Sequence, residues 1–362
     1  MLYKLLHQMD RGAFDSSVLS LRAPGQLGKR IERIGIPVET LGLSNRKFPT
    51  PRDLVNLKRV VDKCAPQIIQ GWMYHGNLGA YLGCKLSSKK PTLMWNIRQT
   101  LQSIVNEKWG TRKVIKIGGR LSSRPHKIVF NSNVSIEDHC RVGYSKDKAV
   151  MIPNGFQRQP RNFGRMHRDR ARQELGFRAD QIVFGCVGRY HPKKDQLGFI
   201  RASARVVKKI SDAQFFLVGR DVCEQNHNLV SEIDRLELRE HCRLLGEKED
   251  IFAVMAAADF VVSSSTWGEG FPNTIGEAMS IGIPCIVTDV GESRELVGEA
   301  GIVVRPKNVD ELAQRMIAAS ELAPEGRNEM GEDAQLRIEK VFSIETITET
   351  YANLYNSIHT DI

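Results

Sequence analysis

Residues 263–296 read SSSTWGEGFPNTIGEAMSIGIPCIVTDVGESREL and carry the most informative pattern of the chain. An apolar run ending at Ser264 predicts a strand, and a glycine-rich loop follows it. Residues 274–281 have helical spacing, with Asn273 as the expected N-cap and Gly282 after the last turn. A strand, a loop and a helix in this order are typical of a parallel sheet that binds ligands at the carboxyl ends of its strands.

The same alternation of strand and helix patterns extends through the rest of the chain. The predicted strands are 17–21, 38–41, 68–72, 92–97, 127–132 and 149–153 in the first part, and 182–188, 214–219, 242–246, 260–264, 285–289 and 302–305 in the second. This pattern predicts an α/β protein with two doubly wound parallel sheets facing across a cleft. We expect a first domain at 1–157, an arginine-rich solvated linker at 158–180, a second domain at 181–340, and a C-terminal helix at 341–362 that packs back on the first domain.

The charge of the chain is unevenly distributed. The net charge is +10, but residues 1–150 hold 26 basic and 10 acidic side chains, or +16, whereas the remaining residues hold 26 and 32, or −6. A basic first part suits either nucleic acid or an anionic membrane surface. The run from Arg158 to Arg172 has no stacking aromatic residue except Phe163, which favours a solvated segment over a nucleic-acid site. No nucleic-acid partner is therefore expected.

The sequence also bears on the cellular compartment. No apolar run approaches the roughly 18 residues of a transmembrane helix, and the first residues lack a secretory signal. The seven cysteines are odd in number and widely spaced, which is typical of reduced residues in a core. We expect a cytoplasmic protein, with the basic part able to rest on the inner face of the cytoplasmic membrane.

Two short segments carry candidate chemistry. Glu269 and Glu277 lie on either side of the first turn of the predicted helix at 274–281, where free backbone N–H groups form a site for a diphosphate. Arg189 and Lys194 follow the strand 182–188, and a guanidinium with an ammonium suits the same anion. Taken alone, the segment with Glu269 and Glu277 could equally be a helix with an acidic first turn. The segment with Arg189 and Lys194 could equally be a solvated basic turn. No D-x-D pair occurs, so no metal site is indicated and the cations would replace a metal.

Together these segments resemble the retaining glycosyltransferases of family 4, which have the GT-B fold. The family's E-x7-E motif corresponds to Glu269 through Glu277, and its GR-x4-K motif to Gly188-Arg189 through Lys194. Further matches are Phe216-Leu-Val-Gly219, Leu244-Leu-Gly246, Pro284 to Asp289 with Gly291, and Ile152-Pro-Asn-Gly155. The resemblance implies an enzyme that moves a sugar, without a cofactor or metal, from a UDP- or GDP-sugar to a saccharide acceptor, typically lipid-linked, in bacterial polysaccharide biosynthesis.

The resemblance also implies a role for individual residues. Arg189 and Lys194 would stabilise the leaving nucleoside diphosphate, Glu269 would bind the donated sugar, and His75 would face the reacting sugar. The expected substrate-binding residues are Gly188, Gly246, Gly270, Phe271, Pro272, Asn273, Thr274 and Glu277, where Glu277 binds the ribose, together with Arg98 on the acceptor side.

The first residues depart from the family pattern. Members open with a strand, a glycine-rich loop and a helix, whereas residues 1–21 here resemble the end of that helix and the second strand. We therefore expect a first domain that lacks a central strand, with unpaired backbone beside the gap. A nucleotide-sugar 2-epimerase of the same fold and a truncated, non-catalytic nucleotide-sugar-binding paralogue are the alternative interpretations.

Overall fold

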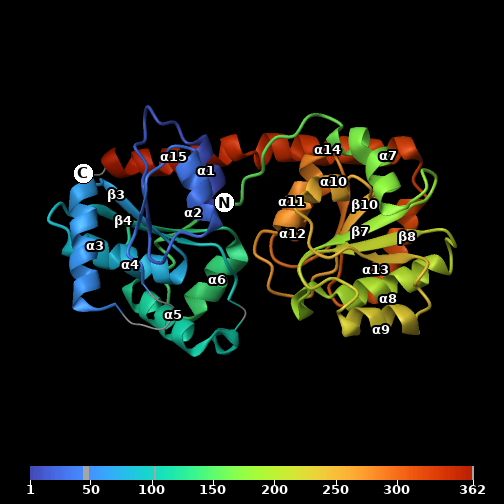
Figure 1. The fold of residues 1–362 in the computed structure, drawn as a ribbon, viewed down its shortest axis with the longest axis horizontal. Coiled ribbons are helices and arrows are strands. Elements are labelled where there is room, and N and C mark those ends of the chain that lie inside the picture. Colours follow the sequence, from blue (N-terminus) through green and yellow to red (C-terminus); the bar gives the residue numbers. More distant parts are fainter. Residues whose placement is uncertain (44–48, 102, 361–362) are drawn as a thin grey trace. The chain divides into compact units, whose positions relative to one another are not determined.

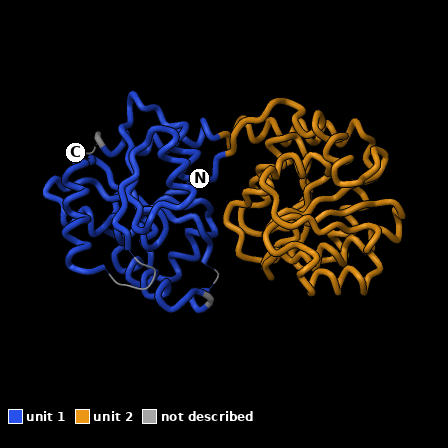
Figure 2. Tube along the Cα trace, in the orientation of Figure 1, with its two compact units in different colours: residues 1–155, 344–362 blue, residues 156–343 orange. Residues whose placement is uncertain are grey.

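The computed structural model describes residues 1–43, 49–101 and 103–360. The chain divides into two compact units (Figure 2): residues 1–155 together with the segment from 344 onward, and residues 156–343. The chain passes between the units twice, at 155/156 and at 343/344, and Phe156 pairs with Ser343 beside these two positions.

The second unit contains a six-stranded parallel sheet (Figure 1). Its strands are β7 (Val183–Val187), β8 (Gln214–Val218), β9 (Cys242–Leu244), β10 (Phe260–Ser263), β11 (Cys285–Thr288) and β12 (Gly301–Val304). Every residue of β8 and β11 is buried, as is usual for a parallel sheet with helices on both faces.

The strand order of this sheet is β12-β11-β10-β7-β8-β9. The order reverses between β7 and β10, and such a switch point leaves a crevice outside the carboxyl ends of the two strands. The loops that follow β7 and β10 are the segments in which the sequence predicts the chemistry. The topology thus brings the two predicted segments to one edge of one sheet.

The helices of the second unit include a segment that the sequence analysis assigned to a linker. They are α7 (Phe163–Leu175), α8 (Gln196–Val207), α9 (His227–Arg235), α10 (Ile251–Met255), α11 (Asn273–Ser280), α12 (Ser293–Val297), α13 (Val309–Ser320) and α14 (Pro324–Val341), with short 3₁₀ turns η2 (Pro192–Lys194) and η3 (Gly298–Ala300). The expectation of a solvated linker at 158–180 is wrong, because α7 spans half of it and packs within the second unit.

A buried charge network holds α7 in place. The Arg172 side chain is only 1% exposed and donates to the carboxylate of Asp259 at 2.7 Å and to the carbonyl oxygen of Gln181 at 2.8 Å. Arg168 also reaches Asp259, at 2.7 Å, and the backbone N–H of Val183 donates to the same carboxylate. The arginine-rich composition that suggested a solvated segment therefore serves, in part, to anchor a helix to the start of β7.

The first unit contains two separate parallel sheets. One is the pair β1 (Val18–Ser20) and β2 (Val38–Thr40); the other has four strands in the order β3 (Ile68–Trp72), β4 (Thr92–Ile97), β5 (Lys127–Phe130) and β6 (Ala149–Met151). No described strand pairs with both β1 and β3, so two sheets occur where the strand pattern alone predicts one.

The first unit's helices pack against its two sheets. They are α1 (Leu2–Gln8), α2 (Gln26–Arg33), α3 (Pro51–Cys64), α4 (Met73–Leu86), α5 (Trp109–Leu121), α6 (Asn133–Arg141) and α15 (Ile344–Thr360), with the 3₁₀ turn η1 (Ile104–Asn106). α15 begins after the second passage between the units, and its Ile347, Tyr351 and Ile358 pack with Leu5 of α1 and Met94 of β4. The C-terminal helix thus belongs to the first unit, and it starts three residues later than the sequence analysis placed it.

The strand predictions and the observed strands agree closely. Each of the twelve predicted strands corresponds to one in the structure, and most observed strands are one or two residues shorter than predicted. The expectation for the cysteines holds only in part, since Cys186, Cys242 and Cys285 are buried while Cys64 is exposed.

Candidate functional site

Two loops of the second unit lie against each other at the switch point of the sheet. The backbone N–H of Thr266 donates to the carbonyl oxygen of Lys193 at 2.8 Å, and the Ser264 hydroxyl donates to the carbonyl oxygens of Lys194 and Asp195 at 2.9 and 3.0 Å. The Lys193 ammonium reaches the carbonyl oxygen of Gly268 at 3.3 Å. The loop after β7 is therefore fixed to the loop after β10 by backbone and side-chain hydrogen bonds.

An ion pair lies at the centre of this contact. The Lys194 ammonium is 2.7 Å from Oε1 of Glu269, whose side chain is only 8% exposed. The Ser265 hydroxyl donates to the same oxygen at 2.9 Å. Burial alone would raise the pKa of Glu269, but the charges of Lys194 and Lys193 and the Ser265 hydroxyl outweigh it and hold this pKa below its ordinary value. The structure brings together two of the predicted catalytic residues, with Glu269 ionised.

The rest of the β7 loop is positively charged. Partial burial lowers the pKa of His191, and the neighbouring charges of Arg189, Lys193 and Lys194 lower it further. Partial burial also lowers the pKa of Lys193, although the carboxylate of Glu269 opposes that change. Three cations beside one carboxylate leave an excess of positive charge, which favours a ligand with more than one negative charge.

A pocket of about 330 Å³ opens beside these loops. It is lined by residues at or near the carboxyl ends of β7, β8 and β9: Val187, Gly188, Arg189, Val218, Gly219, Arg220, Glu247, Lys248 and Ile251. A side chain at Gly219 would place its Cβ 2.3 Å from the carbonyl oxygen of Gly188, so only glycine allows these loops to approach so closely. Gly188 and Arg189, both predicted site residues, thus line a cavity that lies beside the ion pair.

Gly246 lies in the backbone that shapes this pocket. It has a left-handed φ of +69°, its carbonyl oxygen accepts from the N–H of Gly219 at 2.8 Å, and its own N–H donates to Val222. Glu247 follows it directly and lines the pocket. The predicted loop after Gly246 therefore lies at the same cavity as Arg189.

The glycine-rich loop after β10 is braced from behind. Gly291 has a φ of +62°, and a Cβ there would lie 2.3 Å from the carbonyl oxygen of Glu269. The N–H of Glu292 donates to the carbonyl oxygen of Gly270 at 2.9 Å. The turn at 289–292 thus supports the loop that carries Glu269 and Gly270.

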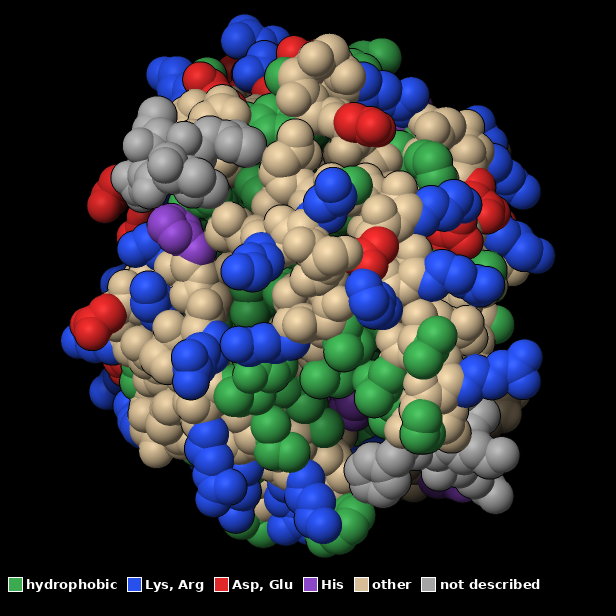
Figure 3. All heavy atoms as spheres, turned by 90° about the vertical axis from the view of Figure 1, so that its left-hand side faces the viewer, with side chains coloured by type: hydrophobic (Ala, Val, Ile, Leu, Met, Phe, Trp, Pro, Cys, Tyr) green, Lys and Arg blue, Asp and Glu red, His purple; other side chains and the backbone are tan. Residues whose placement is uncertain are grey.

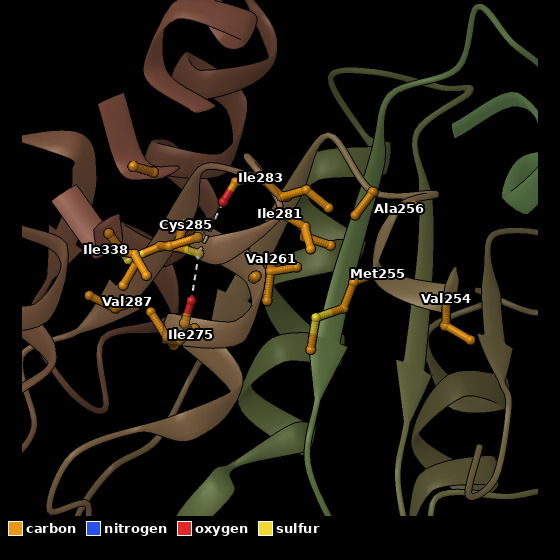
Figure 4. Close-up of a cluster of buried hydrophobic side chains, with 14 of the residues drawn as sticks. Val254, Met255, Ala256, Val261, Ile275, Ile281, Ile283, Cys285, Val287 and Ile338 are labelled. Carbon is orange, nitrogen blue, oxygen red and sulfur yellow. Dashed lines mark hydrogen bonds between the residues drawn. The ribbon is translucent and has the colours of Figure 1, made fainter. Parts of the chain in front are cut away.

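α11 follows this loop and is anchored by a buried cluster (Figure 4). Ile275 of the helix packs with Val261 of β10 and with Cys285 and Val287 of β11, and the Cys285 thiol reaches the carbonyl oxygens of Ile275 and Ile283. The expected N-cap is wrong by one residue: Pro272 takes that position without a side-chain cap, and Asn273 is the first helical residue. Proline fits there because its fixed φ suits the start of a helix.

The predicted substrate-binding residues at the start of α11 differ in exposure. Phe271 and Pro272 are buried, Thr274 and Glu277 are half-buried, and Asn273 is exposed. Phe271 stacks on Phe156 with ring centroids 6.2 Å apart, so its side chain has a packing role. Its backbone, together with that of Gly270 and Thr274, remains the part predicted to meet a ligand.

His75 and Arg98 belong to the first unit. His75 lies in the first turn of α4, directly after β3, and it is exposed; partial desolvation and the charge of Arg22 lower its pKa. The Arg98 guanidinium follows β4 and donates to Asn154 at 3.0 Å and to the Tyr351 hydroxyl at 2.9 Å. Its hydrogen bonds thus tie β4 to α15 and to the segment that precedes the first passage between the units.

Sequence reasoning missed several residues of the site. Lys193 and Ser265 hold the two loops and the Glu269 carboxylate, and Arg220 and Lys248 line the pocket. Gln196, which is buried, donates to the carbonyl oxygen of Arg189 at 2.9 Å and fixes the β7 loop. Lys193 was visible in the sequence as the neighbour of Lys194, whereas the other residues act through contacts that only the fold creates.

Among the described residues, no group of three or more His, Cys, Asp or Glu side chains is arranged to hold a metal ion. No helix among residues 1–43, 49–101 and 103–360 is long and apolar enough to cross a membrane.

Each of the two units matches a known protein family. Residues 181–321 match the family model described as glycosyl transferases group 1, and residues 1–159 match glycosyltransferase family 4. A curated relative, UDP-Gal:alpha-D-GlcNAc-diphosphoundecaprenol alpha-1,3-galactosyltransferase of Escherichia coli, is 27% identical over 212 residues, which cover 58% of this chain and 54% of the relative. The chain thus matches about half the length of that relative.

Solved structures resemble the chain along its whole length. HepE of Anabaena in complex with UDP has a TM-score of 0.79 at 23% identity, covering 98% of this chain and 96% of HepE. A glycosyltransferase of Rickettsia africae has a TM-score of 0.81 at 17% identity, covering 100% of this chain and 95% of that protein. The fold of the two units is that of the GT-B proteins.

Proposed function

Because the chain belongs to the glycosyltransferases of family 4 and has the GT-B fold, we propose that it transfers a sugar from a nucleotide-sugar donor to a saccharide acceptor with retention of configuration. The observation that carries this proposal is the Lys194–Glu269 ion pair beside the 330 Å³ pocket at the switch point of the second unit. That edge combines excess positive charge for a diphosphate with a buried carboxylate for sugar hydroxyls.

The chemistry follows from the charges at this edge. In the reaction the bond between the sugar and the diphosphate breaks, and negative charge develops on the departing phosphate oxygen. We propose that Arg189 and Lys194 stabilise that charge and that Glu269 holds hydroxyls of the sugar. The departing phosphate then takes the acceptor proton as the new bond forms on the same face, so no protein nucleophile is required. For His75 and Glu277 we propose the roles that the family resemblance implies: contact with the reacting sugar for His75 and binding of the ribose for Glu277.

Positive charge from the protein also supports a reaction without a divalent metal. Three cations of the β7 loop, Arg189, Lys193 and Lys194, lie close enough to His191 to lower its pKa, and they would supply the positive charge that a metal otherwise brings to a diphosphate. Turnover is expected to persist in millimolar EDTA at the rate seen with Mg²⁺. A rate that falls to background with EDTA and returns with Mg²⁺ or Mn²⁺ would contradict this part of the proposal.

A lipid-linked acceptor is proposed from the comparisons and from charge. The galactosyltransferase of Escherichia coli is named for an acceptor on diphosphoundecaprenol. Residues 1–150 carry +16, and on the face that Figure 3 shows Lys and Arg side chains are far more numerous than Asp and Glu side chains. We propose a cytoplasmic enzyme that works at the inner face of the membrane on a polysaccharide precursor.

The direct test is a transfer reaction with a panel of UDP- and GDP-sugars and an undecaprenyl-diphosphate-linked saccharide. We expect nucleoside diphosphate release that depends on the acceptor, and a product in which NMR shows the donor's anomeric configuration. Formation of ManNAc and UDP from UDP-GlcNAc without an acceptor would identify a 2-epimerase instead. Binding of donors with no turnover would identify a non-catalytic paralogue.

A further inference from the structure

The helix α5 and the turn before it present an unusual exposed surface on the first unit. Three large apolar side chains lie on it: Val105 is 68% exposed, Trp109 61% and Ile117 43%. Exposed Lys and Arg residues surround them. We call the set Val105, Lys108, Trp109, Lys113, Lys116, Ile117 and Arg120 the α5 surface.

The helical part of the α5 surface forms one face. Trp109, Lys113 and Ile117 are spaced four residues apart, so they lie above one another along α5. Lys116 and Arg120 flank this row. The opposite face of α5 carries Ile115, Gly118 and Gly119, all buried against the first unit. The exposed residues are therefore not needed to fill the core. They form a solvent-exposed row that is both apolar and basic.

The sequence from Val105 to Arg120 holds a single carboxylate, that of Glu107, which accepts a hydrogen bond from Gln99. From Lys108 to Ile136 the sequence contains seven Lys and Arg residues and no Asp or Glu. Among the described residues, none of Lys108, Lys113, Lys116 and Arg120 forms an ion pair with a carboxylate. By contrast, Lys58 and Arg141, on other helices of the same unit, pair with Asp62 and Glu137. The α5 surface thus keeps its positive charge for an external anion.

The combination of side chains favours a lipid surface over a nucleic acid. Trp at the level of the headgroups, with Lys and Arg beside it, is the pattern by which an amphipathic helix lies on an anionic bilayer. A nucleic-acid site needs an aromatic ring that is free to stack, whereas the Lys113 ammonium lies 3.7 Å from the centre of the Trp109 ring and covers one face of it.

We propose that the α5 surface is the part of the chain that contacts an anionic membrane, with Trp109, Ile117 and Val105 in the headgroup layer and the basic residues on lipid phosphates. This inference rests on the proposed function for its purpose, since an enzyme that uses a lipid-linked acceptor must reach the bilayer. It names a surface on the first unit, remote in sequence from every residue of the site in the second unit.

The test is co-sedimentation of the full chain with vesicles of phosphatidylcholine, with and without 30% phosphatidylglycerol. We expect binding only to the anionic vesicles, and weaker binding in 0.5 M salt than in 0.1 M salt. The triple variant Lys113→Ser, Lys116→Ser, Arg120→Ser is expected to bind on the order of 10²-fold more weakly, since each basic residue near an anionic surface contributes about five-fold. The matched control Lys89→Ser, Lys208→Ser, Lys209→Ser removes the same charge from exposed positions elsewhere and should lose far less.

Tryptophan fluorescence separates insertion from simple attraction of charge. Trp109 is the one exposed tryptophan of four, so anionic vesicles should shift the emission to shorter wavelength in the wild type and not in Trp109→Phe. Equal loss of binding in the α5 and control triples, or no shift, would overturn the inference. So would salt-dependent binding to RNA or DNA without binding to vesicles. UDP binding measured on the same samples keeps the two proposals apart: a chain that binds UDP but no vesicle contradicts only this one, and the reverse contradicts only the donor site.

Discussion

The contact between Lys194 and Glu269 shows how one pair of residues can serve both parts of a donor. Each partner neutralises the other while the site holds no ligand, which limits the cost of keeping Glu269 nearly buried. A diphosphate offers the Lys194 ammonium a new partner, and sugar hydroxyls offer one to the Glu269 carboxylate. Both can therefore exchange their mutual bond for bonds to the donor, with Ser265 holding Glu269 in place.

Loss of either cation should slow the chemical step. We expect Arg189→Ala and Lys194→Ala each to lower kcat by on the order of 10²–10³, as removal of one preorganised donor does elsewhere. Lys208→Ala, an exposed lysine beyond the end of α8, is the control and should leave kcat unchanged. Steady-state kinetics measure all three; wild-type turnover in both site variants would remove Arg189 and Lys194 from the mechanism.

His139 should make the first unit sensitive to acid. It is fully buried between Tyr74, Phe130 and Tyr144, and its Nε2 accepts from the Tyr74 hydroxyl at 2.9 Å while Nδ1 donates to the carbonyl oxygen of Ser135. Burial lowers the pKa of His139 to about 4, below its value of about 6.5 in the unfolded chain.

The unfolded chain therefore binds a proton at His139 more readily than the folded chain does between these two pH values. Neutral, buried His139 therefore costs the folded state nothing above pH 6.5. As pH falls from 6.5 toward 4 the free energy of unfolding decreases, and by pH 5 the decrease is about 2 kcal/mol. Urea unfolding at pH 7 and pH 5 measures it. His139→Gln should lack most of this dependence and His126→Gln should keep it; the same dependence in both variants would contradict the assignment.

At the level of single residues, the sequence predicted the charged side chains of the candidate site. It missed the polar residues that hold those side chains and their loops in position. Arg189, Lys194 and Glu269 could be found because their spacing after strands places them at one edge. Gln196 and Ser265 have no distinctive spacing, and they matter only because the fold places them against the carbonyl oxygen of Arg189 and the carboxylate of Glu269.

Among the elements, α7 shows how composition can mislead. Its arginines indicated a solvated segment, but Arg172 and Arg168 meet the buried Asp259 across more than 80 residues of sequence. Pairing over such a distance leaves no local pattern. The strands, in contrast, were predictable because each is a short apolar run between loop residues, and the parallel topology follows from their alternation with helices.

Breaking the buried network of Asp259 with Arg168 and Arg172 should destabilise the second unit. Asp259→Ala leaves Arg168 and Arg172 without their carboxylate, and we expect it to lower the free energy of unfolding by about 3–5 kcal/mol. The control Asp180→Ala removes an exposed partner of Arg178 and should change it by less than about 1 kcal/mol. Urea titration gives both values. Equal effects from the two substitutions would show that the buried network does not anchor α7.

Arg98 offers a similar test for α15. Its hydrogen bonds to Asn154 and Tyr351 favour a positioning role, so Arg98→Met should speed amide hydrogen exchange in α15 by on the order of 10-fold, through loss of a buried bond. Tyr351→Phe should do the same. If Arg98 instead binds the acceptor, as the family resemblance implies, Arg98→Met would raise the acceptor KM while exchange in α15 and the properties of Tyr351→Phe stayed unchanged.

For the molecule as a whole, the two units differ in how completely their sheets are formed. The second unit has one continuous sheet of six strands, and it carries the charged edge and the pocket. The first unit has two sheets, a large excess of positive charge and the α5 surface. The count of charges along the sequence predicted a basic first part. The structure places the candidate catalytic residues and the pocket in the second unit, and the exposed basic and apolar α5 surface in the first.

The most direct measurement is calorimetric titration of the full chain with UDP-, GDP- and ADP-sugars, repeated with Arg189→Ala and Glu277→Ala. A donor site at the carboxyl edge of the second sheet predicts that at least one nucleotide sugar binds and that both substitutions weaken it by 10-fold or more, or about 1.4 kcal/mol. Lys208→Ala should bind like the wild type. If no nucleotide sugar binds, or if the site variants bind as tightly as the wild type, the donor site does not lie where the structure places the Lys194–Glu269 pair.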